Sequence, residues 1–179
     1  SIKDRAALFI VEDAIKDKKI KKGGIIIEGT AGNTGIGLAI VAKAYGLSLR
    51  VVIPNTQSIE KKKTLEDLGA ELIEVDAAPY SSPNNYVKQS KIIAEKLSKS
   101  NQNGVLWANQ FDNTVNADAH IKTTSQEIWI QTAGMIHGFV CSVGTGGTLA
   151  GVSIGLKERN KNIKIALSDP MGSSLYSHV

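Results

Sequence analysis

Short apolar runs alternate with amphipathic stretches along the whole chain. Residues 25–27 are three consecutive isoleucines, typical of a buried parallel strand, and residues 139–143 form a second apolar run that predicts another strand. Apolar residues elsewhere recur with helical spacing, and the expected helices are 4–20, 36–45, 59–68, 85–97, 120–131 and one from about 147 onward. The expected strands are 25–27, 49–53, 71–75, 105–108, 136–143 and 163–167. This alternation predicts an α/β protein with mostly parallel sheets that helices cover on both faces.

Two of the expected strands end in glycine-rich loops, Gly-Thr-Ala-Gly-Asn-Thr-Gly at residues 29–35 and Gly-Thr-Gly-Gly-Thr at residues 144–148. Ligands of parallel α/β proteins bind at this end of the strands. In the second loop the glycines let the backbone turn sharply and point its N–H groups at one place, and the threonines add hydroxyl groups. The helix that follows adds the positive end of its dipole. We therefore predict that residues 144–148 form a phosphate-binding loop. The alternative is a tight turn with no ligand-binding function.

A polar stretch at residues 110–117 separates the expected elements into two groups. Its core, Phe-Asp-Asn-Thr-Val-Asn-Ala, disfavours a helix, so we expect it to cross between two α/β subdomains. The expected boundaries are 1–112 for the N-terminal subdomain and 113–179 for the C-terminal one. Each subdomain would then carry one of the two glycine loops.

Composition narrows the classes of function. The 179 residues are 42% hydrophobic and 21% charged, which is the balance of a soluble globular protein. No apolar run is long enough to cross a membrane and the first residues do not resemble a signal peptide, so we expect no membrane partner and a cytoplasmic location. The net charge of +4 rests mostly on lysines with few aromatic residues among them, so we expect no nucleic-acid partner.

The isolated cysteine and histidine side chains do not indicate a catalytic or metal site. The single cysteine, Cys141, lies in an apolar strand and is expected to be a small buried side chain. His120 and His137 are expected to be structural, because no spacing among the histidines suggests a metal site. The dinucleotide pattern G-x-G-x-x-G would need a glycine where Leu149 stands, and the nucleotide pattern G-x-x-x-x-G-K-[ST] does not occur. Asp169, after the next strand, keeps a nicotinamide-dependent dehydrogenase as a third alternative.

Lys3 lies at the start of the first expected helix. The positive end of a helix dipole disfavours a second positive charge, so this amine would lose some basicity and could attack a carbonyl group. An ordinary surface lysine is the alternative. Lys3 and the two glycine loops could together serve one anionic ligand.

Three motifs stand in a fixed order, Ser-Ile-Lys-Asp-Arg at residues 1–5, Glu-Gly-Thr-Ala-Gly-Asn-Thr-Gly at 28–35 and Gly-Thr-Gly-Gly-Thr at 144–148. In this order and at these separations they resemble the cysteine synthase (O-acetylserine sulfhydrylase) family of fold type II pyridoxal-phosphate enzymes. Residues 109–111 and 120–129 also resemble that family, so the likeness covers essentially the whole chain. The resemblance implies a tryptophan synthase β-like α/β fold of two three-layer αβα subdomains.

The resemblance also implies a role for each motif. Lys3 matches the lysine that forms the Schiff base with pyridoxal 5'-phosphate and later moves the substrate α-proton. Asn33 matches the side chain that hydrogen-bonds the 3′-oxygen of the pyridine ring. The phosphate cup is matched by Gly144, Thr145, Gly146, Gly147 and Thr148. The groups that bind the substrate carboxylate are matched by Thr30, Ala31, Gly32, Thr34 and Gln110.

The implied reaction is a β-replacement in cysteine biosynthesis, in which O-acetylserine and sulfide give cysteine and acetate. The family is typically dimeric, so we expect a homodimer of the full-length protein and a small amino acid as its substrate. Family members carry a further strand and helix before the first motif and a long segment after residue 179, including the group that faces the pyridine nitrogen. The chain is therefore expected to be an internal fragment with an incomplete C-terminal subdomain.

Some positions depart from the family pattern. Proline and serine are common where this chain has Gly29 and Ala31, and glycine-proline is usual where it has Ser125 and Gln126. These differences bear on substrate preference more than on cofactor use. Within the fold the rivals are cystathionine β-synthase, which shares the motifs, and the serine or threonine dehydratases, whose asparagine loop usually continues into histidine. From another class, a non-catalytic α/β fragment that binds a ligand or a partner stays open.

Overall fold

The computed structural model describes residues 1–173 and 175. The chain divides into two compact units, Ser1–Asn113 and Thr114–Val179, each with its own sheet. The elements of the first unit are α1 (Lys3–Lys16), β1 (Ile25–Gly29), α2 (Asn33–Tyr45), β2 (Ser48–Pro54), α3 (Ile59–Asp67), β3 (Ala70–Val75), α4 (Tyr86–Ser98) and β4 (Val105–Trp107). Most of these elements lie within a few residues of the expected ranges.

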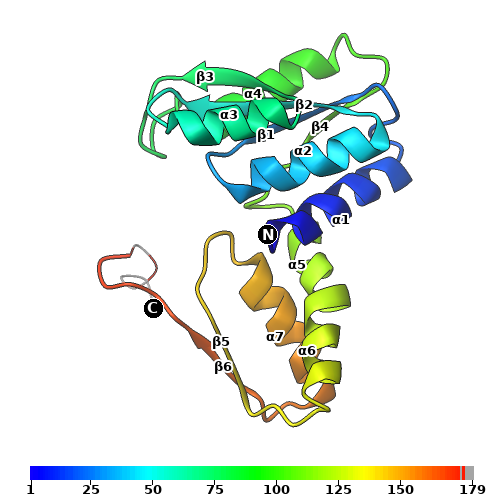
Figure 1. Ribbon diagram of the computed structural model, residues 1–179, viewed down its shortest axis with the longest axis vertical. Coiled ribbons are helices and arrows are strands. Elements are labelled where there is room, and N and C mark those ends of the chain that lie inside the picture. Colours follow the sequence, from blue (N-terminus) through cyan, green and yellow to red (C-terminus); the bar gives the residue numbers. More distant parts are fainter. Residues whose placement is uncertain (174, 176–179) are drawn as a thin grey trace. The chain divides into compact units, whose positions relative to one another are not determined.

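The first unit has three layers. Its strands form a parallel sheet in the order β3-β2-β1-β4, with Ile27 of β1 opposite Arg50 on one side and Trp107 on the other. α4 covers one face of this sheet, and α2 and α3 lie on the other face with α1 packed on α2 (Figure 1). Ile27, Val52 and Ala94 form the centre of the α4 side. The expected α/β fold with parallel strands is confirmed.

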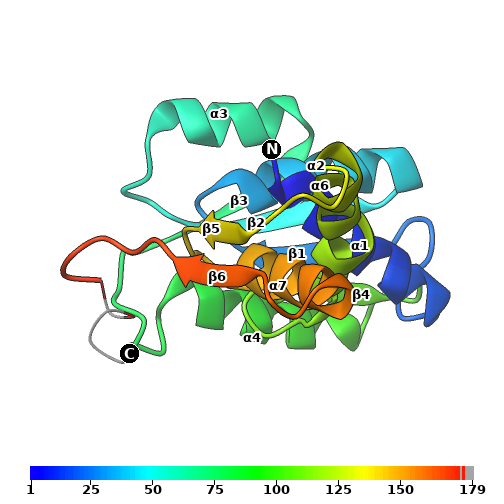
Figure 2. The same cartoon turned by 90° about the horizontal axis from the view of Figure 1, so that it is seen from below.

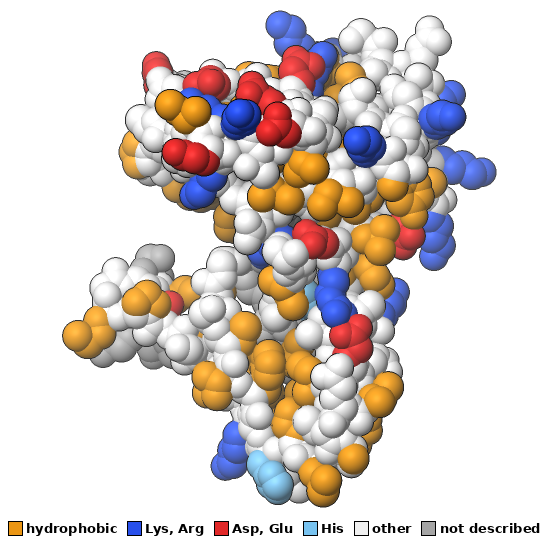
Figure 3. All heavy atoms as spheres, in the orientation of Figure 1, with side chains coloured by type: hydrophobic (Ala, Val, Ile, Leu, Met, Phe, Trp, Pro, Cys, Tyr) orange, Lys and Arg blue, Asp and Glu red, His pale blue; other side chains and the backbone are white. Residues whose placement is uncertain are grey.

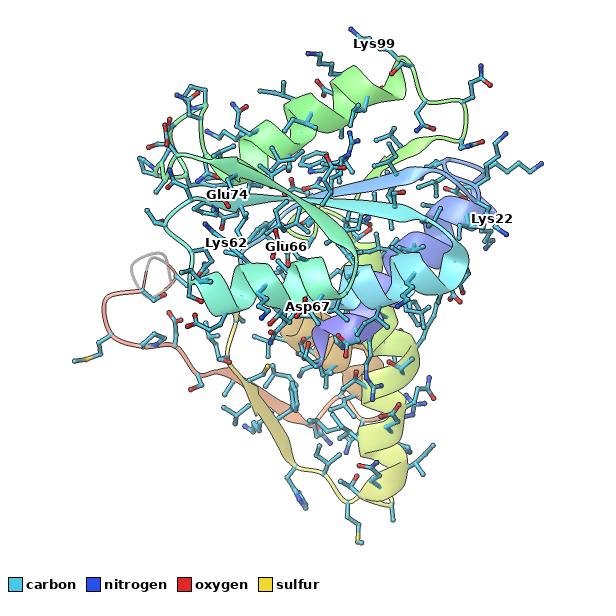
Figure 4. The ribbon with its side chains drawn as sticks, turned by 45° about the horizontal axis from the view of Figure 1, so that its top comes forward. Lys22, Lys62, Glu66, Asp67, Glu74 and Lys99 are labelled. Carbon is cyan, nitrogen blue, oxygen red and sulfur yellow. The ribbon has the colours of Figure 1, made fainter. Side chains whose placement is uncertain are left out.

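An ion pair fastens α3 to the edge of the sheet. Figure 4 shows Lys62 of α3 beside Glu74 of β3, and the Lys62 Nζ lies 2.6 Å from the Glu74 carboxylate. The same Nζ donates a hydrogen bond to the Asn55 carbonyl oxygen at 2.8 Å. α3 therefore has polar as well as apolar attachments to the sheet.

The turn from β1 into α2 is tight. Gly29 lies against α4, where an added Cβ would come within 2.7 Å of the Val87 Cα atom. The Thr30 hydroxyl then accepts a hydrogen bond from the Gly32 N–H at 3.2 Å, which bends the chain toward the helix. α2 begins at Asn33 rather than at residue 36, so residues 33–35 form its first turn. The apolar pattern missed this turn because its residues are polar or glycine.

The second unit consists of helices packed on a two-stranded sheet. Its elements are α5 (Val115–Ala119), the π-helix η1 (His120–Thr124), α6 (Ser125–Gln131), β5 (Gly138–Cys141), α7 (Gly147–Arg159) and β6 (Lys164–Leu167). β5 and β6 pair in parallel, and α7 lies beside them (Figure 2). The core of this unit contains Val152, Leu156 and Ile163, and Phe139 and Ile165 of the strands pack against them.

Glycines at every fourth position of α7 allow close packing on the helical segment from α5 to α6. A Cβ at Gly151 would lie 2.3 Å from the Ala117 carbonyl oxygen, and one at Gly155 would lie 2.1 Å from Ser125 Oγ. This packing stabilises a helix that begins at Val115, so the prediction of a helix-breaking loop through residue 117 was wrong there. The sequence pattern did not predict α5 because several of its residues are polar, and apolar periodicity indicates only elements that bury apolar side chains.

Some hydrophobic side chains of the second unit are exposed to solvent. Val140 of β5 is 65% exposed, and Figure 3 shows further hydrophobic side chains on the surface of this unit. A two-stranded sheet is marginally stable in water by itself, so the packing of Phe139 and Ile165 on Val152 and Leu156 stabilises these strands. No helix within the described residues has the length and apolar character needed to cross a membrane.

Candidate functional site

The loop between β1 and α2 presents the start of a 13-residue helix. Asn33 is exposed at the first position of α2, and Gly32 before it is exposed in an extended conformation. Thr30 and Thr34 are buried, and Ala31 between them is half-buried. The N–H groups of a first helical turn have no partners within their helix, so this loop combines backbone donors with hydroxyl groups.

Gln110 lies against this loop although it is 76 positions away from Thr34 in the chain. The Thr34 hydroxyl donates a hydrogen bond to Gln110 Oε1 at 2.5 Å. Gln110 follows β4, whose carboxyl end is next to that of β1 in the parallel sheet. The structure thus brings together Thr30, Thr34 and Gln110, three of the residues expected to bind a substrate carboxylate.

Glu28 is a buried carboxyl group that the sequence did not single out as functional. It is the fourth residue of the five-residue strand β1 and is only 1% exposed. Burial raises the pKa of Glu28 to about 7, although hydrogen bonds from Gln110 and Asn109 oppose the shift. Nothing in the sequence distinguishes this position from a solvated glutamate at a strand end.

Lys3 is the first residue of α1 and is half-buried. Burial lowers the pKa of Lys3, because a charged amine loses water there. The direction agrees with the expected loss of basicity, and desolvation is its cause. The Lys3 N–H donates a hydrogen bond to Ser1 Oγ at 3.2 Å, which holds the first turn of the helix. A larger share of the neutral amine makes Lys3 a better nucleophile.

The second glycine loop opens α7. Gly146 precedes the helix with a φ of +89°, a left-handed conformation that favours glycine. Gly147 is buried, and an added Cβ would lie 2.3 Å from Asn116 Oδ1. Two neighbouring side chains hold the loop threonines, since Asn116 Nδ2 donates to Thr145 Oγ1 at 2.9 Å and His120 Nε2 lies 3.2 Å from Thr148 Oγ1. The loop is therefore held in place from the α5–η1 segment.

His120 and Asn116 are positioning residues that the sequence did not identify. His120 is fully buried, and its Nδ1 lies 2.9 Å from Thr124 Oγ1. It opens the π-helix η1, in which the Ser125 N–H bonds the His120 carbonyl oxygen. The glycine spacing of α7 was the available signal, because it predicts a close helical neighbour. Among the described residues no group of histidine, cysteine or acidic side chains could hold a metal ion.

Comparisons with known proteins agree with this geometry. The family model described as pyridoxal-phosphate dependent enzyme matches residues 1–179. Cysteine synthase 1 from Emericella nidulans is 48% identical, and the match covers 100% of this chain and 47% of that protein. The O-acetylserine dependent cystathionine beta-synthase of Bacillus subtilis is 41% identical, with 98% of this chain and 55% of that protein covered.

Solved structures give the same result. O-acetyl serine sulfhydrylase isoform 3 from Entamoeba histolytica superposes with a TM-score of 0.85 at 37% identity, covering 100% of this chain and 51% of that one. The chain spans about half the length of the relatives it matches. The resemblance of the three motifs is confirmed over the whole sequence, and the chain belongs to the family of pyridoxal-phosphate-dependent enzymes.

Proposed function

We propose that the protein carrying this chain converts O-acetylserine and sulfide into cysteine and acetate with pyridoxal 5'-phosphate as its cofactor. The observation that carries this proposal is the 48% identity to a cysteine synthase along the entire chain. The geometry of the two glycine loops and of Lys3 supports it, because the three motifs offer the donors and the amine that such a reaction needs.

The second glycine loop fits the phosphate of the cofactor. Gly144 and Gly146 would offer backbone N–H groups just before a 13-residue helix, whose dipole favours an anion. Gly147 is buried and its N–H donates to Thr145 Oγ1 at 3.5 Å, which helps to hold the loop. Thr145 and Thr148 add hydroxyl groups whose positions Asn116 and His120 fix. A phosphate dianion requires several donors that converge without a nearby carboxylate, and this loop supplies donors of that kind.

Lys3 and Asn33 fit the other end of the cofactor. Lys3 would hold the aldehyde carbon through its Nζ, and its lowered pKa favours the neutral amine that this requires. Asn33, exposed at the first turn of α2, would donate to the ring oxygen. When bound, pyridoxal phosphate withdraws electrons from the substrate α-carbon and makes its proton acidic. Lys3 would then take up and return this proton.

The loop before α2 would bind the substrate carboxylate. Thr30, Ala31, Gly32 and Thr34 surround the helix start with backbone and hydroxyl donors, and Gln110 approaches from the end of β4. Ala31 lacks the hydroxyl that family members commonly have, so the backbone donors would carry more of the binding here. A small amino acid is the substrate class that this loop favours.

Under this proposal each subdomain would contribute a different part of the active site. Residues 1–112 would supply the lysine and the carboxylate loop, and residues 113–179 would supply the phosphate loop. A homodimer, a cytoplasmic location and the lack of a nucleic-acid partner remain predictions for the full-length protein.

A second candidate is a related β-replacement with a thiol amino acid in place of sulfide. The similarity to an O-acetylserine dependent cystathionine beta-synthase at 41% identity favours it over the dehydratases. A non-catalytic fragment would be the remaining alternative if the chain by itself is the functional product.

The experiment uses the full-length protein and compares two substrate pairs, O-acetylserine with sulfide and serine with homocysteine. We expect faster turnover of the first pair, a yellow cofactor-loaded protein, and loss of both its visible absorption and its activity in Lys3→Ala. Lys43→Ala, an exposed lysine of α2, serves as the matched control and should keep both. Failure of the wild type with both pairs would contradict the proposed function.

A further inference from the structure

Glu28 is a buried carboxyl group for which the proposed reaction gives no direct role. Its Oε1 faces the Gln110 N–H at 3.5 Å, and its Oε2 accepts no well-formed hydrogen bond from the described residues. Taking a carboxyl group out of water is unfavourable unless its oxygens are fully bonded. An uncharged side chain would fill the same space on β1 at a smaller free-energy penalty, so the carboxyl group indicates a function beyond packing.

Gln110 connects Glu28 to the loop before α2. Thr34 Oγ1 donates to Gln110 Oε1, and the Gln110 side chain lies close enough to the Glu28 carboxyl group to oppose the rise of its pKa. The only donor on a glutamine side chain is its amide nitrogen, so the nitrogen faces Glu28 while the oxygen faces Thr34. An acceptor on one side and a donor on the other determine which way this amide is turned.

We propose that Glu28 is a positioning residue that orients the Gln110 amide for recognition of the substrate carboxylate. The inference rests on the proposed function, in which Gln110 contacts that carboxylate. The amide nitrogen that Glu28 holds carries two N–H groups, and an N–H is the kind of donor that a carboxylate ligand requires. With the amide turned the other way, Gln110 would present an oxygen to an anion and repel it.

The substitution Glu28→Gln tests the orientation directly. It keeps the size of the side chain but removes its negative charge and one of its two acceptor oxygens, so the Gln110 nitrogen loses its charged acceptor and the amide can adopt the reversed orientation. Calorimetry on the full-length protein loaded with pyridoxal phosphate measures the affinities of L-alanine and of L-alaninamide, which lacks the carboxylate. The wild type should prefer L-alanine, and Glu28→Gln should reduce this preference about tenfold, as expected for one hydrogen bond to a charged group.

The matched control is Glu95→Gln, the same change at an exposed glutamate of α4, and it should keep the wild-type preference. An unchanged preference in Glu28→Gln overturns the inference, because a purely structural role would weaken both ligands alike. If the wild type binds L-alanine but the preference does not change, only the inference fails. If the wild type binds no amino acid, the proposed function and the inference fail together.

If Glu28→Gln does not fold, a measurement on the wild type tests the contact between Glu28 and the Gln110 amide. The side-chain amide resonances of Gln110, assigned by their loss in Gln110→Met, should shift as Glu28 titrates at about pH 7. Such a shift supports the contact through which Glu28 acts. Resonances that stay fixed from about pH 5 to pH 9 would overturn the inference, since that range brackets the titration.

Discussion

The two glycine-rich loops share the order strand, loop and helix, yet their surroundings differ. In and just after the first loop, added Cβ atoms at Gly29, Gly35 and Gly37 would each come within 3.0 Å of a neighbouring atom. In the second loop, no described atom lies within 4 Å of such a Cβ at Gly144 or Gly146. Packing therefore explains Gly29 and Gly35 of the first loop but not Gly32, and no packing contact explains Gly144 or Gly146 of the second.

Glycine therefore has a different structural role in each of the two loops. The first loop is part of a core built on four strands, so its shape belongs to the fold. The second loop follows a strand that has one partner, and side-chain bonds from Asn116 and His120 hold its threonines. Changes at the packed glycines Gly29 and Gly35 should therefore act mainly on stability, and changes at Gly144 or Gly146 mainly on ligand affinity.

The largest expected effect concerns Glu28, at the base of the first loop. Its pKa is raised to about 7 in the folded state, from 4.5 for an unperturbed glutamate. The unfolded chain therefore loses this proton first, and the stability that Glu28 contributes at low pH is lost as the pH rises through this interval. We expect the free energy of unfolding of the wild type, relative to Glu28→Gln, to fall by about 3 kcal/mol across it.

Urea unfolding at a series of pH values measures this difference. Above the folded-state pKa the two curves should run parallel, because Glu28 is then ionised in both states of the wild type. Glu95→Gln, at an exposed site, should follow the wild-type curve throughout. Parallel curves for Glu28→Gln over the entire range would show that Glu28 ionises with the same pKa in the folded and unfolded chain, and would contradict the prediction.

The next effect tests packing at the start of the first loop. Gly29→Ala would place a Cβ 2.7 Å from the Val87 Cα and 2.8 Å from the Tyr86 carbonyl oxygen, both backbone atoms that cannot move alone. We expect a loss of about 2 kcal/mol in the free energy of unfolding, typical of overpacking. Gly32→Ala is the control, because no described atom lies within 4 Å of its Cβ and its backbone is extended. Equal effects of the two changes would remove the packing explanation.

The same contrast shows how far the sequence predicts the fold. Apolar periodicity located the strands and most of the helices, because those elements bury apolar faces. It missed the first turn of α2 at Asn33 and all of α5, which begins at Val115. Both are held by contacts of polar residues or glycines, and such contacts leave no hydrophobic period.

The sequence predicted those parts of the candidate site that form short motifs, but not the contacts between residues distant in sequence. Motif spacing predicted the two loops and Lys3, since glycines and a lysine next to a helix start carry a chemical meaning of their own. Glu28 and Asn116 were not predictable, because their roles depend on burial beside Gln110 and Thr145, which are distant in sequence. The assignment of each expected site residue to its ligand stays a prediction.

A smaller effect on stability, with a clear effect on binding, is expected at Asn116. Asn116→Ala removes the hydrogen bond to Thr145 and should lower the free energy of unfolding by about 1 kcal/mol. Pyridoxal phosphate affinity of the full-length protein, followed by visible absorption, should fall about fivefold as the loop hydroxyl loses its orientation. Asn162→Ala, at an exposed asparagine, is the control. A loss of stability without a loss of affinity would assign Asn116 to packing alone.

The smallest effect on stability is expected at Gly144, and it tests the comparison most directly. Gly144→Ala adds a methyl group where no described atom lies within 4 Å, so the free energy of unfolding should change by less than about 0.5 kcal/mol. Gly146→Ala, at a φ of +89°, should lose about 1 kcal/mol from backbone strain. Both should weaken pyridoxal phosphate binding, because a methyl group on either residue would crowd the N–H groups that are proposed to face the phosphate. If Gly144→Ala left the affinity unchanged, position 144 would lie outside the phosphate loop, and the glycine there would reflect neither packing nor binding.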